Sequence, residues 1–175
     1  MQENAKKKQV LSCLTDVLND NGFRAQLHDA TDTSLLMLRA ETQRLCKVGK
    51  EAVIDLCFIP VQLPDENEGL LQFYVTLFSD LPDLYKRAVR ETIDYCNDYC
   101  MLGQFGYFEP AGQIFLKYSC LIDGSAELQK VIQLIADNLS LLVASVSRFI
   151  DALSMVGYTG TPIEVLVDQG VLPSM

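Results

Sequence analysis

Three long stretches of the chain place apolar residues three or four positions apart, which is the spacing of an amphipathic helix. The first spans residues 4–21 and ends at Gly22, a residue suited to the left-handed conformation of a helix stop. The second follows Pro82 and carries apolar side chains as far as Cys100. The third runs from Ser125 to Gly157 with a heptad period, which predicts a helix with one persistently buried face. Its apolar positions are Leu128, Ile132, Ile135, Leu139, Leu142, Val146, Phe149 and Leu153.

Between these helices the chain alternates apolar and polar residues, as strands with one wet face do. Residues 23–29 predict a short strand, and residues 52–63 and 70–78 predict two longer strands joined by a charged loop at 65–69. Residues 101–109 and 113–121 predict a second hairpin, whose turn is Pro110-Ala111-Gly112. The segment from Leu35 to Lys50 fits either a strand or a helix; the alternation over residues 34–41 favours a strand, followed by a loop or helical turn.

The order of these elements predicts the fold class. A helix, three or four strands, a helix, a hairpin and a long helix indicate an α+β domain in which an antiparallel sheet packs against helices. We expect this single domain to span residues 1–157. A short helix opening at Thr161-Pro162 and closing at Gly170 would form a tail, residues 158–175, that packs on the domain or on a partner.

Charge and composition narrow the expected partners and location. The 175-residue chain has a formal net charge of -9 and a pI near 4.5, so it repels nucleic acid and anionic lipid, and Lys6-Lys7-Lys8 is too short a cluster to reverse this. The most apolar stretch, residues 131–156, is interrupted by charges and free of them only over 138–147, short of a membrane span. Because the N-terminus does not have the pattern of a secretory signal, we expect a cytoplasmic protein. Because the cysteines stand at scattered spacings, we expect their thiols to be reduced and buried.

The candidate chemistry is sparse. One histidine, His28, is too few for a histidine-built metal site, and it stands in what reads as a surface turn. Cys96 and Cys100 share a helix face, where core packing is the favoured interpretation and a metal or redox role the alternative. No phosphate-binding glycine loop and no nucleophile motif occur. We therefore expect no enzyme activity, no metal and no cofactor, with a thiol reaction through Cys96 as the least implausible enzyme.

Two sets of side chains are candidate binding surfaces. The long helix carries apolar residues beside its buried seam, and either it lies deep between sheet and tail or part of it faces a partner. The candidate partner or dimer surface comprises Leu134, Leu141, Val143, Ile150, Ile163 and Leu166. Aromatic residues of the second hairpin are read first as sheet core and alternatively as a ligand pocket. These are Phe105, Tyr107, Phe115 and Tyr118.

One stretch also resembles a known family. The helix ETIDYCNDYC leads into the hairpin GQFGYFEPAGQIFLKYSC, then into the break IDGS and the long apolar helix. This layout is similar to that of the bacterial YbjN-like proteins, which share the fold of class I type III secretion chaperones. The pattern covers about half of the chain by residue and places core and turn residues at matching positions. These are Asn97, Phe105, Phe108, Gly112, Phe115 and Tyr118.

The resemblance implies a function but transfers no catalytic residue. Proteins of this kind are small, acidic homodimers that hold a polypeptide client, or bacterial regulators. The leading hypothesis is therefore a non-enzymatic, chaperone-like or regulatory protein-binding module that self-associates and binds a protein or peptide client at a sheet edge or an apolar groove. The alternative is a small-ligand sensor that uses the aromatic sheet face.

Overall fold

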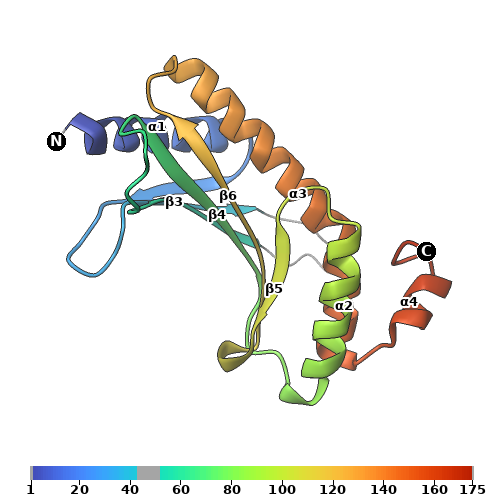
Figure 1. Ribbon diagram of the computed structural model, residues 1–175. Helices are drawn as coiled ribbons and strands as arrows, with labels where there is room; N and C mark the ends of the chain where they lie inside the picture. Colours follow the sequence, from blue (N-terminus) through green and yellow to red (C-terminus); the bar gives the residue numbers. More distant parts are fainter. Residues whose placement is uncertain (1, 43–51, 175) are drawn as a thin grey trace. The chain divides into compact units, whose positions relative to one another are not determined.

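The structure is a computed structural model that describes residues 2–42 and 52–174 (Figure 1). The predicted α+β class is confirmed: within these residues an antiparallel open sheet of six strands, in the order β1-β2-β3-β4-β6-β5, is combined with four helices. The helices are α1 (Gln2–Asp20), α2 (Lys86–Asp98), α3 (Leu128–Thr159) and α4 (Ile163–Asp168). The strands are β1 (Arg24–His28), β2 (Met37–Thr42), β3 (Ala52–Ile59), β4 (Glu68–Phe78), β5 (Gln104–Phe108) and β6 (Gln113–Asp123).

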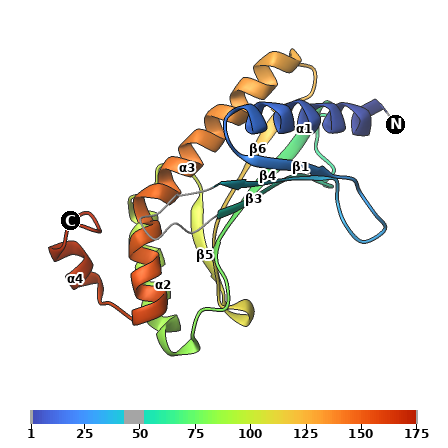
Figure 2. The same ribbon diagram turned by 180° about the vertical axis from the view of Figure 1, so that it is seen from behind.

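The chain divides into two compact units, each assembled from separate segments. The α1 unit comprises residues up to 42, 53–74 and 118–140, and the α2 unit comprises the described residues 52, 75–117 and 141–174. In the α1 unit, α1 packs on β1 and β2, and Figure 2 shows it running alongside β1. In the α2 unit, α2 packs on β5 and continues from a short 3-10 turn, η1 (Asp83–Tyr85).

The core of each unit follows the predicted periodicities. In β4 the burial alternates along the strand, with Leu71, Phe73 and Val75 almost inaccessible and the residues between them half-buried. Leu11 and Leu14 of α1 are fully buried in the α1 unit, because they lie on the helix face that covers the sheet. The alternation and the helical stripe therefore each identify residues that are buried in the structure.

Several predicted boundaries needed correction. The ambiguous segment does contain a strand, β2, while residues 43–51 lie outside the described part of the chain. The strand predicted over 52–63 ends at Ile59, because Pro60 cannot donate a ladder hydrogen bond. The second hairpin is confirmed, with η2 (Glu109–Ala111) and the left-handed Gly112 forming its turn.

Gly157 was expected to end the long helix, and that prediction is wrong. The helix continues to Thr159, and Gly160 takes the left-handed conformation instead, with φ of 67°. Gly157 is buried inside the helix, where a Cβ atom would come within 3.0 Å of the Leu81 side chain. Its function is close packing in the α2 unit and not termination.

The C-terminal tail packs on the α2 unit. Leu166 and Leu172 are buried, and the Tyr95 hydroxyl donates a hydrogen bond of 2.5 Å to the Pro173 carbonyl oxygen. The short tail helix is confirmed, although Thr161 does not cap it; its hydroxyl pairs with that of Thr159 at 2.7 Å.

By length and composition alone, α3 is apolar enough to cross a membrane, which the charge-based reading of the sequence did not anticipate. Half of the residues in its most apolar window are buried within the chain, and the core helix of a soluble protein passes the same test. This observation is therefore weak evidence for a membrane span.

Candidate binding groove

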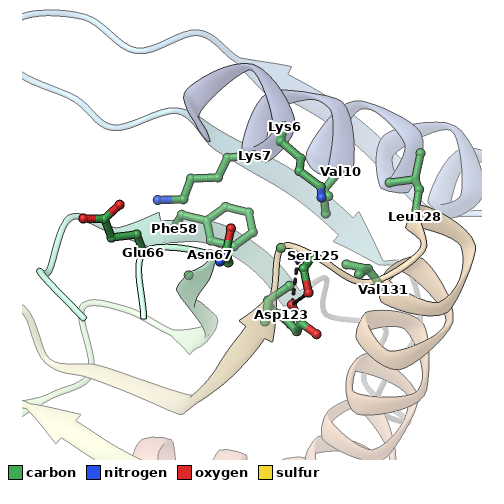
Figure 3. A pocket seen from close by; sticks show the side chains of 13 residues that line it. Lys6, Lys7, Val10, Phe58, Glu66, Asn67, Asp123, Ser125, Leu128 and Val131 are labelled. Carbon is green, nitrogen blue, oxygen red and sulfur yellow. Dashed lines mark hydrogen bonds between the residues drawn. The ribbon is translucent and has the colours of Figure 1, made fainter. Parts of the chain in front are cut away.

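A groove with two hollows, here called the turn lobe and the loop lobe, lies within the α1 unit. The turn lobe, of about 420 Å³, is drawn in Figure 3, where side chains from α1, β3 and α3 surround it. Its apolar side is formed by Val10, Phe58, Ile122, Leu128 and Val131. Its polar side is formed by Lys6, Lys7, Glu66, Asn67, Asp123 and Ser125, together with Gly69 and Gly124.

The loop lobe lies on the other side of Phe58 and Lys7, which line both hollows. Its volume is about 610 Å³. The remaining lining residues are Lys8 of α1, Pro60 directly after β3, and four residues of the segment between β1 and β2: Asp29, Ala30, Leu35 and Leu36. Leu35 is 43% exposed, so this lobe offers apolar surface to a partner.

Phe58 forms the ridge between the two lobes, and the sequence around it explains its position. The ammonium group of Lys7 lies 5.7 Å from the centroid of the Phe58 ring, within reach of a cation–π interaction. On the adjacent strand, a Cβ atom at Gly69 would come within 3.0 Å of the ring. Glycine at this position therefore leaves room for the aromatic platform.

The wall of the turn lobe consists of two turns that dock on each other. The Asp65 carboxylate accepts hydrogen bonds from the backbone N–H and side-chain amide of Asn67, at 2.8 and 3.1 Å. The Gly124 N–H in turn donates to the Asn67 carbonyl at 2.7 Å. A Cβ atom at Gly124 would lie 2.4 Å from that oxygen, so only glycine permits this contact. The wall is therefore shaped before any ligand binds.

The charges of the groove balance. One oxygen of Asp123 accepts hydrogen bonds from the Ser125 hydroxyl at 2.6 Å and the Ser125 N–H at 2.7 Å. These bonds, with a smaller contribution from Lys6, lower the pKa of Asp123, so this carboxyl is not a proton donor near pH 7. Lys8 pairs with Asp29 at 2.5 Å. Three lysines and three acids thus surround an apolar floor, a lining that suits binding.

The predicted partner surface is only partly a surface. Leu134 and Leu141 are 47% and 45% exposed, and Val143 and Ile163 are half-buried. Ile150 and Leu166 are 1% and 0% exposed, so their assignment to a partner surface is wrong. Both belong to the core of the α2 unit, where the tail helix covers apolar residues of its own unit. The six residues therefore do not form one continuous surface.

The predicted aromatic pocket is not formed by its four residues. In the β5–β6 pairing, Phe105 lies opposite Leu116 and Tyr107 opposite Ile114, whereas Phe115 lies opposite Gly106. Since side chains alternate along a strand, Phe115 points to the other face from Phe105 and Tyr107. Phe105 instead packs edge-on against Phe149 of α3, with ring centroids 5.8 Å apart. The core interpretation is the one supported for Phe105.

Tyr118 belongs to the α1 unit and contacts Phe73 of β4, at a centroid distance of 5.8 Å. It is three positions from Phe115 along β6, so the two rings lie on opposite faces of the strand. His28 is exposed at the end of β1. Within residues 2–42 and 52–174, no group of three or more histidine, cysteine or acidic side chains could hold a metal ion.

The thiols described by the structure are free, and only one of them is fully buried. Cys96 is inaccessible, whereas Cys13, Cys57, Cys100 and Cys120 are half-buried, and Cys46 lies outside the described residues. Burial, with a smaller effect of nearby Cys100, raises the pKa of Cys96 to about 12. Because the thiolate is the reactive species, this environment does not favour a thiol enzyme built on Cys96.

A labelling experiment checks this environment. Iodoacetamide at pH 7.5 should alkylate Cys96 in the native protein at least ~100-fold more slowly than in urea, since burial suppresses both access and ionisation. Peptide mass spectrometry after timed quenching measures each cysteine separately, and half-buried Cys13 serves as the internal comparison. Native labelling of Cys96 as fast as in urea would contradict the buried, protonated thiol and restore the thiol-enzyme hypothesis.

The groove could not be predicted from the sequence, although the segments that line it each have a recognisable local pattern. Lys6-Lys7-Lys8, the 65–69 loop and the Asp123-Gly124-Ser125 turn were each interpreted as local features of a helix, a loop and a helix start. They come together only because β4 and β6 are neighbours in the sheet and α1 packs beside them.

Comparison with known proteins gives no relative: no family model, no curated protein and no solved structure matches the chain.

Proposed function

We propose that this chain is a non-enzymatic protein-binding module, chaperone-like or regulatory, that holds a segment of a client polypeptide in the groove of the α1 unit. The observation that carries the proposal is the pair of apolar lobes on either side of the Phe58–Lys7 ridge. Two adjoining hollows that share Phe58 and Lys7 can take successive bulky side chains of one extended segment. The resemblance in sequence pattern to the YbjN-like proteins implies the same kind of function, although no family model matches the chain.

The electrostatic environment supports a polypeptide partner in a second way. The protein as a whole is strongly acidic, with a formal net charge of -9, so most of its surface repels an acidic segment. In the groove, by contrast, Lys6, Lys7 and Lys8 offset the local acids. A client segment of either sign can therefore approach this part of the molecule, and burial of its apolar side chains supplies the affinity.

Self-association is part of the proposal, as the family resemblance implies. Leu141 of α3 is the candidate residue of the α2 unit, because its wholly apolar side chain is nearly half exposed to water. Contact with a second copy would remove this apolar surface from water. Light scattering at several protein concentrations measures the oligomeric state directly.

Photo-crosslinking tests the groove. A photoreactive amino acid at Glu66, on the rim of the turn lobe, should crosslink a polypeptide in lysate of the host. The same amino acid at Lys130, which is 78% exposed and lines neither lobe, is the matched control. Substituting Phe58→Asp should weaken the crosslink at least ~10-fold, equivalent to about 1.4 kcal/mol of binding free energy. Circular dichroism verifies that the variant is folded.

The outcomes separate the classes of function. Equal crosslinking from the two positions, or a crosslink unaffected by Phe58→Asp, would contradict client binding in the groove. A crosslinked adduct of small mass would replace the polypeptide client by a small apolar ligand and make the protein a sensor. Thermal-shift measurements would then test that ligand, because binding to the folded state raises Tm.

A further inference from the structure

The two outer strands of the sheet, β1 and β5, each have one residue whose outward backbone N–H and C=O are both hydrogen-bonded to an asparagine side chain. In the strand order β1 and β5 have one strand neighbour each. An edge strand normally presents unpaired N–H and C=O groups to which another chain can add a strand. How a protein treats those groups decides whether partners can bind by strand addition.

At β1 the partner is Asn19 of α1. Its side-chain oxygen accepts the Ala25 N–H at 2.9 Å, and its side-chain nitrogen donates to the Ala25 carbonyl at 3.1 Å. A carboxamide presents an acceptor and a donor toward the same side, as the C=O and N–H of one residue in a strand do, so Asn19 takes the place of one residue of an absent neighbouring strand. We call this pair of bonds a clasp.

The α2 unit contains the same clasp independently. The Asn97 oxygen accepts the Phe105 N–H at 2.8 Å, and its nitrogen donates to the Phe105 carbonyl at 3.0 Å. Asn19 and Asn97 are each the penultimate residue of a helix and are each followed by aspartate. After each helix comes a glycine with positive φ, Gly22 or Gly103, and then the clasped strand. The recurrence indicates a requirement and not an accident of one loop.

The clasps leave little edge to pair with. In an antiparallel strand, alternate residues direct both backbone groups to the same side. Because Ala25 and Phe105 face outward, Leu27 and Tyr107 are the other outward residues of the five-residue strands β1 and β5. Each edge thus keeps one residue whose backbone groups could pair with an added strand. Strand addition gains its affinity from several successive main-chain hydrogen bonds.

We propose that Asn19 and Asn97 lock the two sheet edges, so that another polypeptide, above all a second copy of this chain, cannot add a strand at β1 or β5 unless the clasp is displaced. A copy of the chain is the expected occupant of an unlocked edge, because two antiparallel β5 strands related by a two-fold axis form a self-complementary pair. The inference argues against the alternative in which a client adds a strand at a sheet edge, and it is independent of whether the groove binds a client.

Hydrogen exchange in the wild-type protein gives the first test. The Ala25 and Phe105 amide protons are bonded to a clasp, whereas those of Leu27 and Tyr107 face outward without it. NMR exchange rates should therefore be at least ~10-fold slower at Ala25 than at Leu27, and at Phe105 than at Tyr107. Equal rates within both pairs would overturn the proposal without any variant.

Substitution gives the second test. Asn97→Ala should raise the Phe105 exchange rate at least ~10-fold and produce self-association above the wild-type level that grows with concentration in sedimentation velocity. In the associated state the Tyr107 amide should become protected, because strand addition pairs it.

The control is Asn138→Ala, which removes a half-buried asparagine of α3 that contacts Cys120. This variant should change neither the exchange rates nor the self-association. Two results with a folded Asn97→Ala variant would overturn the proposal: no association beyond the wild-type level, or association in which the Tyr107 amide still exchanges rapidly. If the variant does not fold, the exchange rates of the wild-type protein decide.

Discussion

Replacing Ile150 by aspartate should unfold the protein, whereas the same replacement at Leu141 should leave it folded. Both residues lie on α3 in the α2 unit, but Ile150 is 1% exposed and Leu141 is 45% exposed. Removing a buried isoleucine side chain costs about 2–5 kcal/mol, and a buried unpaired carboxyl group adds a desolvation penalty of similar size. The sum is comparable with the roughly 5–15 kcal/mol that stabilises a typical domain.

Urea denaturation followed by circular dichroism measures both effects. For Ile150→Asp we expect a loss of more than about 4 kcal/mol, or no cooperative transition at all. For Leu141→Asp we expect a change of about 1 kcal/mol or less, since its side chain already contacts water. Leu141→Asp then permits a clean measurement of self-association in a folded protein. A stable Ile150→Asp protein would mean that this part of α3 is not core.

The elements of the fold could be predicted because each has a local periodic signal. The heptad positions of α3 are buried in the structure, from Ile132 to Leu153, and the alternation in β4 matches its burial. Boundaries were less predictable where two explanations of one residue compete. Gly157 resembles a helix stop, but the close approach of Leu81 requires glycine at that place inside the helix. Sequence gives no sign of such a tertiary contact.

The candidate sites were less predictable than the fold, for two different reasons. Assigning Phe105, Tyr107, Phe115 and Tyr118 to one pocket neglected information that the sequence contained, because Phe115 and Tyr118 are an odd number of positions apart on one strand. The groove, in contrast, depends on which strands are neighbours. Phe58 and Gly69 gain their significance only from the β3–β4 pairing.

The two asparagine clasps fall between these cases. Asn97 was noticed as part of a family-like pattern, although its hydrogen bonds to Phe105 could not be derived from the sequence. The repeated order of helix, Asn-Asp, glycine and strand is visible in the sequence around residues 19–25 and 97–105. The function of this repeated order follows from the sheet order, because only an edge strand has outward backbone groups that a clasp can bind.

Gly112→Ala should be among the most destabilising single-methyl additions in the protein, and Gly170→Ala is its matched comparison. Both glycines have positive φ, 51° and 68°, so alanine pays the left-handed backbone penalty of about 1–2 kcal/mol at each. Only at Gly112 does the new Cβ atom meet backbone: it would lie 2.7 Å from the nitrogen and the oxygen of Leu81, whereas nothing lies within 4 Å at Gly170.

The consequence at Gly112 extends to the docking of the β5–β6 turn on the chain before η1. That docking uses hydrogen bonds from the Leu81 N–H to the Gly112 carbonyl at 3.1 Å and from the Asp80 N–H to the Ala111 carbonyl at 3.0 Å. A methyl group must push these partners apart, so we expect a total loss of roughly 3–4 kcal/mol, against about 1 kcal/mol for Gly170→Ala. Calorimetry should show Tm lowered by about 10 °C and about 3 °C respectively. Equal shifts would mean that backbone strain alone sets the cost and that the turn does not dock tightly on Leu81.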